Sequence, residues 1–541
     1  MSGVKALISR AAPPVKSRLS ITRRRVFFAL LVLAWVLASA PGRGAGVTVI
    51  THGFNGNVTD WVIPMAEAMP GYASFPGTTD TCYELAITRN GSGQYVATIS
   101  LHHGVPPTES DSGEIFIKLD WSTLSGVGGA STTTVANATV GALLSTTLIP
   151  ELGGRALAEL PMHLIGHSRG GSVVTEMARL LGAQGVWVDQ VTTLDPRPVA
   201  GFGDADVTTY ANVLYADNFW QTLGDGLFVP NGQSLFGAYN RKLTSLSGGY
   251  SSSHSDVHLW YHGTIDLATP CTDTQATIDS TQRSAWWTTT EMAGAEAGFR
   301  YSAIGGGDRL SSVEPAGAGN GRINDGFNKK WHLGGGVAAN RTSLPANSGL
   351  WPNVIRAGRT ATTPVPAGEP FDVVLYHQSG ANGSGNVEVR IFLDVDFNPY
   401  SGPVTEIDQR LLPNTGTNAV LASMLTVSTD EAIVAPGTYT VGVRISDGVR
   451  TRYVYLPDEL VITSALSAPR IDTQSLTWID GNKLRFNVLA SPGQTVAVRA
   501  TSDFVNWVTL QTSTFTGSVW QFTDADAGTF TRRFYKAVLV P

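Results

Sequence analysis

The chain has 541 residues, of which 42% are hydrophobic and only 15% are charged, and it contains 59 glycines. The length allows three or four domains, while the composition excludes a coiled coil, an acidic disordered protein and long exposed helices. The formal net charge is −6, but residues 1–45 carry eight basic residues and no acidic ones, so the remaining 29 basic and 43 acidic residues leave −14. A chain this acidic is not expected to bind nucleic acid, because it lacks the positive charge that attracts phosphate.

The N-terminal segment has the pattern of an export signal. Three consecutive arginines at 23–25 precede a largely apolar run at 26–40, and small residues follow it. This order is typical of a secretory signal, and the run is shorter than the about 20 residues that a membrane span needs. We therefore predict that residues 1–45 are a signal peptide and that the protein is exported to the periplasm, the cell surface or the medium. An uncleaved membrane anchor is the alternative.

Residues 46–305 alternate short apolar runs with stretches of helical spacing. Such alternation is typical of a parallel sheet wrapped by helices. It predicts a catalytic domain of the α/β class, with a mostly parallel sheet and helices on both of its faces. Strands are predicted at 47–50, 115–119, 162–165, 191–194 and 213–215, and helices at 135–148 and 172–181.

The remainder of the chain has the pattern of β-structure. A glycine-rich linker is predicted at 306–352, a β-sandwich module at 353–464 and a second, small β-module at 465–541, because short alternating strands and turn signals replace the helical pattern. The last module, with SDFVNW at 502–507 and RRFY at 532–535, resembles small C-terminal β-modules of exported bacterial proteins. This likeness implies attachment to a cell surface or a polymer.

The central motif of the catalytic domain is Gly166-His167-Ser168-Arg169-Gly170. An apolar strand runs into it and a helical stretch leaves it, which is the setting in which a G-x-S-x-G motif exposes a nucleophilic serine. The glycines are needed because the turn is tight and the strand and helix approach closely. Ser168 is the predicted nucleophile.

Acyl transfer also needs amide donors directed at the developing oxyanion. The backbone amide of Arg169 directly follows the nucleophile. The loop Thr51-His52-Gly53-Phe54 follows the first predicted strand, and its Phe54 amide is the predicted second donor. Phe54 and Arg169 are therefore the expected oxyanion hole.

The acid has two candidates. Asp195 ends the strand after the helix that follows Ser168, and Asp217 ends the next predicted strand. Both positions suit a carboxylate that orients a histidine, since in this arrangement the chain order is serine, acid, histidine. A strand-end aspartate is also a common turn residue. The residues favour Asp195 and keep Asp217 as the alternative.

The base is expected among the histidines that follow the acid. His254 lies in a loop before the last predicted helix, and His258 and His262 follow on one helical face. His254 is the favoured base and His258 the alternative. Two histidines four residues apart can also bind a metal, but no glutamate completes an H-E-x-x-H motif, so no metal site is predicted at these histidines.

Five short stretches agree in order and rough spacing with the pancreatic-type lipases: Thr51-His52-Gly53-Phe54, Leu119-Asp120-Trp121, Ile165-Gly166-His167-Ser168, Leu194-Asp195-Pro196 and Ser253-His254. Residues 47–270 thus resemble that family, whose members are α/β-hydrolases acting on acylglycerols and phospholipids. The resemblance implies Asp195 rather than Asp217 as the acid and His254 rather than His258 as the base. Arg169 departs from it, because the family usually has an apolar residue there.

These features predict an exported serine hydrolase that cleaves carboxylic esters, a lipase or esterase, through a Ser168–His254–Asp195 acyl-enzyme mechanism without a cofactor. Its expected partner is a lipid or another ester substrate. Two alternatives stay open. One is a non-catalytic surface-binding or adhesion protein that keeps a hydrolase-like domain, and the other is a peptidase or amidase on the same fold.

Two further questions concern cations and thiols. Asp394, Asp396 and Asn398 alternate as in a calcium loop, but the glycine and glutamate of such a loop are missing. Calcium is therefore possible there, and a polar turn is favoured.

Cys82 and Cys271 are the two cysteines, and in an oxidising compartment they could pair or remain two buried thiols.

Overall fold

The fold is taken from a computed structural model of the chain. It describes residues 46–70, 81–109, 114–224, 230–246, 248–293, 297–299, 341–343, 351–380, 385–416, 420–429, 434–456, 458–465 and 468–540. The predicted signal peptide and most of the predicted linker lie outside these ranges. Within them, no helix is long and apolar enough to cross a membrane.

The N-terminal half is built on one sheet of eight strands in the order β3-β2-β4-β1-β5-β6-β7-β8. All neighbouring strands run parallel except the antiparallel pair β2–β3. The strands are β1 (Gly46–Thr51), β2 (Thr81–Arg89), β3 (Tyr95–Gly104), β4 (Glu114–Asp120), β5 (Met162–His167), β6 (Val188–Leu194), β7 (Val213–Gln221) and β8 (Tyr239–Leu243).

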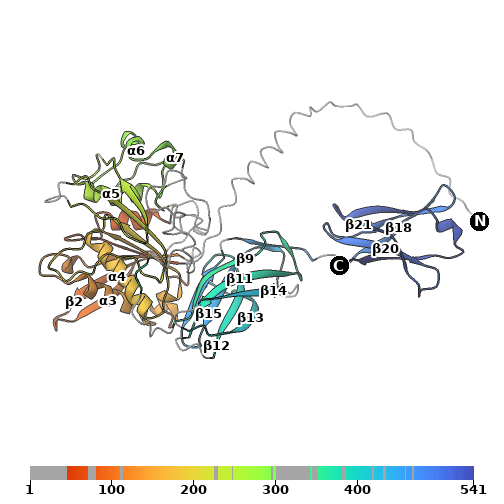
Figure 1. The fold of residues 1–541 in the computed structure, drawn as a ribbon, viewed down its shortest axis with the longest axis horizontal. Coiled ribbons are helices and arrows are strands. Elements are labelled where there is room, and N and C mark those ends of the chain that lie inside the picture. Colours follow the sequence, from red (N-terminus) through yellow and green to blue (C-terminus); the bar gives the residue numbers. More distant parts are fainter. Residues whose placement is uncertain are drawn as a thin grey trace, which may run out of the picture. The chain divides into compact units, whose positions relative to one another are not determined.

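Helices cover both faces of this sheet (Figure 1). Neighbouring residues of one strand belong to opposite sides: Val49 packs in the hydrophobic cluster with α3 and α4, whereas Ile50 packs in the cluster with α2 and α5. This follows from the two-residue period of a strand, which sends successive side chains to opposite faces. The helices are α2 (Val62–Ala68), α3 (Thr132–Leu143), α4 (Arg169–Ala183), α5 (Ser253–Gly263), α6 (Ser280–Trp286) and α7 (Thr289–Met292).

In the next module, the residues that the structure describes form strands and loops. One sheet has the order β10-β17-β15-β12-β13, with β16 paired to β15, and a second has the order β14-β11-β9. Alternate residues of β11, and of β12 as far as Ile391, are buried in the core that the two sheets share, as expected for a sandwich. The strands are β9 (Asn353–Arg359), β10 (Val365–Pro366), β11 (Pro370–Gln378), β12 (Asn386–Asp394), β13 (Thr405–Pro413), β14 (Leu421–Ser428), β15 (Gly437–Ser446), β16 (Thr451–Tyr455) and β17 (Leu460–Thr463).

The C-terminal module has two three-stranded sheets, β18-β19-β22 and β21-β20-β23. Its small core contains Phe486, Val498 and Phe522. The strands are β18 (Arg470–Ile479), β19 (Lys483–Leu489), β20 (Thr495–Thr501), β21 (Val508–Thr514), β22 (Val519–Asp524) and β23 (Phe534–Leu539). The expected β-sandwich character of the C-terminal half therefore fits the structure.

The α/β class predicted for this protein is wrong for the chain as a whole. Strands account for 41% of the structure and helices for 17%, so the molecule is predominantly β. The physical reason is that α2, α3, α4 and α5 pack on the one large sheet, whereas the sheets of the sandwich bury their faces against each other and require no helical layer. The alternation of apolar runs and helical stretches in residues 46–305 predicts that one sheet and its helices. It does not extend to the antiparallel strands of the other modules.

Candidate active site

Ser168 lies at the junction between β5 and α4 in a backbone conformation that few residues adopt, with φ 55° and ψ −122°. Its amide donates to the carbonyl of Leu194 over 2.9 Å. The flanking glycines are required by close approach, because a Cβ on Gly166 would lie 2.2 Å from the Gly170 carbonyl oxygen. Strained positions of this kind concentrate at functional sites.

His254 and Asp195 meet beside this turn. The Nδ1 atom of His254 lies 2.6 Å from Oδ2 of Asp195. Asp195 directly follows β6 and is completely buried, and His254 lies in the first turn of α5. The remaining positions around the carboxylate are also occupied, because it accepts hydrogen bonds from the Gln221 amide, the Gln221 side chain and the Gly232 amide over 2.7–3.0 Å.

His167 connects the serine turn to α5. Its Nε2 donates to the carbonyl of His254 over 2.8 Å, and the two imidazole rings lie 4.6 Å apart. Burial, followed by the charges of His254 and His258, lowers the pKa of His167 well below its usual range. A neutral His167 therefore joins the residue before Ser168 to the helix that carries His254.

The alternative acid and base lie elsewhere. Asp217 is inside β7, which is longer than predicted, and it accepts a hydrogen bond from Thr192 over 2.5 Å. His258 stacks on Trp61, and its Nδ1 lies 3.5 Å from Asp273. The structure therefore brings His254 to Asp195, while Asp217 and His258 have other neighbours.

The loop after β1 packs against the serine turn. A Cβ on Gly53 would lie 2.7 Å from the Cβ of Ser168, so only glycine fits at this distance. Phe54 follows, and its ring contacts that of Phe202 edge-on at 5.7 Å. Parallel strands β1, β5 and β6 end at the same edge of the sheet, and this explains why the 52–56 loop, Ser168 and Asp195 share one place.

The Arg169 side chain has a role that the sequence did not predict. It is completely buried and forms a bidentate ion pair with Asp204 over 2.6–2.7 Å. It also donates to the carbonyls of Ser125 and Ala130 over 2.8–2.9 Å. Its guanidinium thereby ties the start of α4 to two loops. An arginine inside a G-x-S-x-G motif indicates that its side chain has a role of its own. The neighbouring sequence does not show that its partner is Asp204.

The proposed calcium turn is internally hydrogen bonded. Asp394 accepts from the Val395 amide and the Tyr455 hydroxyl, Asp396 accepts from the Asn398 amide, and Asn398 accepts from the Tyr400 amide. Burial raises the pKa of Asp394 to about 6. These bonds suit a polar turn, and calcium binding stays a prediction.

The two cysteines do not form a disulfide with each other; both are buried. Cys82 lies in β2 and Cys271 in the loop after α5. Of the two possibilities that the sequence left open, separate buried thiols are therefore observed.

No protein-family model and no curated protein matches this chain. Among solved structures, a Salmonella alpha-2-macroglobulin mutant matches 34% of this chain at 11% identity and TM-score 0.13, and the match spans 14% of the macroglobulin. A chimeric titin Z1Z2 matches 34% of the chain at 15% identity, with 94% of the titin covered and TM-score 0.15. Chicken CNTN1 FN1–FN3 domains match 36% at 9% identity, with 68% of that chain covered and TM-score 0.16.

These findings correct the resemblance drawn from the sequence. Strands make up 41% of the structure and helices 17%, and no family model or curated protein matches, so the assignment of residues 47–270 to the pancreatic-type lipases is wrong as a statement of family. The classification as a lipase, which depended on that family, loses its support as well. Five short motifs cover a small part of residues 47–270, and such matches do not by themselves establish a family.

Proposed function

We propose that this protein hydrolyses carboxylic esters through a covalent acyl intermediate on Ser168. The observation that carries the proposal is the 2.6 Å contact between His254 Nδ1 and the buried Asp195 carboxylate, next to a serine in a strained strand–helix turn. A serine hydroxyl becomes a nucleophile when a histidine accepts its proton and a carboxylate orients that histidine.

In this scheme His254 uses its two ring nitrogens for different tasks. Nδ1 donates to Asp195, which fixes the tautomer and leaves Nε2 as the base. Nε2 takes the proton from Ser168 Oγ as the oxygen attacks the ester carbonyl, and then gives it to the leaving alcohol. Water, activated in the same way, hydrolyses the acyl-enzyme, so that acid and alcohol are released and the serine is restored.

The amides of Phe54 and Arg169 are the proposed oxyanion donors. Gly53 allows the loop to approach Ser168, and the buried Arg169–Asp204 pair fixes the start of α4 from which the second amide projects. Preorganised donors of this kind are worth roughly 10²–10³ in rate each. No cofactor enters the scheme. Export through residues 1–45 and attachment through the β-modules remain predictions that complete the proposal.

The test uses the purified protein and a series of p-nitrophenyl esters from acetate to long-chain acids. A fluorophosphonate should label Ser168, and the labelled peptide is identified by mass spectrometry. Ser168→Ala should lose both turnover and labelling, whereas the half-buried Ser145→Ala is the matched control and should keep both. If the wild type hydrolyses peptide amides but no ester, the peptidase alternative replaces the proposal. If it does neither and is not labelled, a binding protein is the better interpretation.

A further inference from the structure

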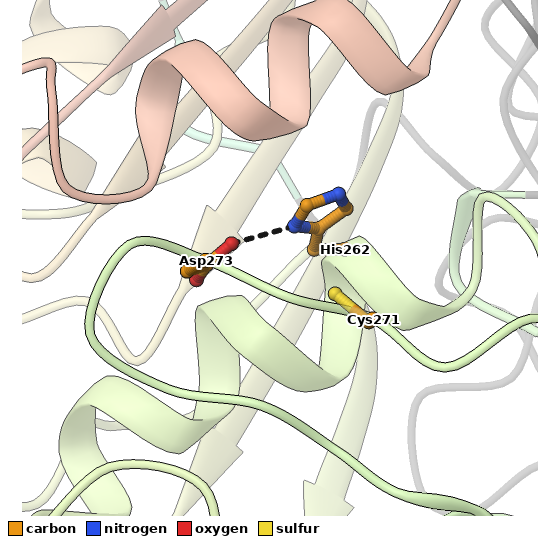
Figure 2. Close-up of side chains that lie close together, drawn as sticks. All are labelled: His262, Cys271 and Asp273. Carbon is orange, nitrogen blue, oxygen red and sulfur yellow. Dashed lines mark hydrogen bonds and ion pairs between the residues drawn. The ribbon is translucent and has the colours of Figure 1, made fainter.

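Three buried side chains with metal-binding atoms lie together at the far end of α5 (Figure 2). The ligand atoms of His262, Cys271 and Asp273 are all within 4.8 Å of one another. Each side chain is less than a tenth exposed. His262 comes from α5, and the other two come from the loop that follows it.

The local structure directs these groups to one point. Thr272 forms an isolated bridge with Thr277, so the chain is extended there and Cys271 and Asp273 project to the same side. The Ile278 amide donates to the Cys271 carbonyl and the Asp273 amide to the Ala276 carbonyl, both over 2.9 Å. The loop is thus closed on itself and holds the thiol and the carboxylate two residues apart.

A fourth group faces the same carboxylate. His258 precedes His262 by one helical turn, so the two rings lie on one face of α5. The Nδ1 of His258 lies 3.5 Å from Oδ2 of Asp273. This nitrogen is buried, and its 3.5 Å contact with Asp273 is longer than an ordinary hydrogen bond. The long contact leaves the nitrogen available to an ion that Asp273 also binds.

We propose that His262, Cys271 and Asp273 bind a zinc ion, with His258 completing the ligand set. One thiolate, one carboxylate and two neutral imidazoles are donors that zinc prefers, in the number that a closed structural site uses. Their charges of −1, −1, 0 and 0 balance the +2 of the ion. An occupied site is therefore neutral overall, which suits a position that is shielded from water.

Zinc binding requires the longer separations, which reach at most 4.8 Å, to shorten and the contact between His262 and Asp273 to lengthen. Zinc–ligand bonds of about 2.0–2.3 Å place tetrahedral ligand atoms roughly 3.3–3.8 Å apart. The 3.5 Å between His258 and Asp273 already has this value. His262 and Asp273 are hydrogen bonded at 2.7 Å, and this bond is exchanged for two bonds to the metal. The alternative, a metal-free polar network, keeps Cys271 as a neutral thiol.

The experiment measures metal binding by the full chain directly. The purified protein is stripped with a chelator, titrated with zinc against a chromophoric competitor, and separately loaded with Co²⁺. We expect one equivalent of zinc and, with cobalt, the near-ultraviolet charge-transfer band of a thiolate ligand. Cys271→Ser should remove that band and weaken zinc binding by more than the about 10–100-fold that outer-shell changes cost. Cys82→Ser, at the other buried cysteine, should change neither.

Each outcome decides the question. No saturable zinc binding tighter than about 100 µM, or a cobalt complex without a thiolate band, overturns the proposal in favour of the polar network. The cobalt spectrum of the wild type decides even if Cys271→Ser fails to fold. Ser168→Ala should bind zinc like the wild type, so failure of the esterase proposal and failure of the zinc proposal are separate results.

Discussion

The contact between His254 and Asp195 joins the first turn of α5 to the end of β6, two elements 59 residues apart in the chain. Asp195 has no exposed surface, and both of its oxygens accept further hydrogen bonds from Gln221 or Gly232. The carboxylate is therefore fixed in one orientation before any substrate arrives. A base that is oriented in advance reacts faster, because no reorganisation is needed during proton transfer.

Asp195→Asn should lower kcat for p-nitrophenyl butyrate by about 10³–10⁴-fold, since an amide no longer enforces the tautomer that leaves Nε2 of His254 as the base. The matched control is Asp217→Asn at the rival acid, and we expect its kcat to stay within about threefold of the wild type. Steady-state kinetics on both variants decide the assignment. A large loss in the Asp217 variant, with a small one in the Asp195 variant, would reverse the roles of the two carboxylates.

The two acids also show what the sequence could and could not predict. The turn at Ser168 depends on contacts between residues that are close in the sequence. The spacing of Gly166 and Gly170 therefore predicts it. The choice between Asp195 and Asp217 depends on strand length, which is set by tertiary pairing: β7 extends beyond Asp217 because β8 pairs with it. Element boundaries are the least reliable part of sequence-based reasoning for this reason.

The sequence does not predict which residues far apart in the chain contact each other. Asp204 lies in a loop 35 residues after Arg169, and the proposed zinc ligands come from a helix and a later loop. No periodicity connects such positions. The histidine spacing in α5 does not by itself predict a metal, because the required partners, Cys271 and Asp273, are not part of the helix. The α/β class failed for a different reason: the strands of the two β-modules outweigh the helices on the two faces of the large sheet.

Gly53→Ala tests the approach of the 52–56 loop to Ser168. The added Cβ would lie 2.7 Å from Cβ of Ser168, so the loop must move away and take the Phe54 amide with it. We expect kcat to fall about 10²-fold with a smaller change in KM, because a displacement of about 1 Å at the reacting atoms costs this much. Gly141→Ala in α3, where nothing lies within 4 Å of the new methyl, is the control. It should leave kcat unchanged and stabilise the protein by roughly 0.5–1 kcal/mol.

Asp204→Asn should destabilise the protein strongly. It leaves the guanidinium of Arg169 buried without its counter-charge, and removing one partner of a buried pair costs about 3–5 kcal/mol of unfolding free energy. Urea unfolding followed by tryptophan fluorescence measures this change. The partly exposed Arg390–Glu388 pair provides the comparison, since Glu388→Gln should cost at most about 1 kcal/mol. Equal losses in both variants would mean that the buried pair contributes no more than a surface pair.

Asp256→Asn tests a buried carboxyl in α5 through the pH dependence of stability. Burial raises the pKa of Asp256 to about 7, although the Tyr250 amide donates to its carboxylate. A raised folded-state pKa means that the folded protein binds the proton more tightly than the unfolded chain. This contribution to stability is complete below about pH 4, the unfolded pKa, and is lost as the pH rises through 7.

The wild type should therefore lose stability relative to the Asn variant between about pH 5 and about pH 8, because asparagine has no proton to release. Urea unfolding of both proteins at these two pH values gives the difference directly. The Asn side chain can still accept from the Tyr250 amide, so the comparison isolates the ionisation from the hydrogen bond. A difference in unfolding free energy that is the same at both pH values would place the Asp256 titration outside this range and remove it as a cause of pH-dependent stability.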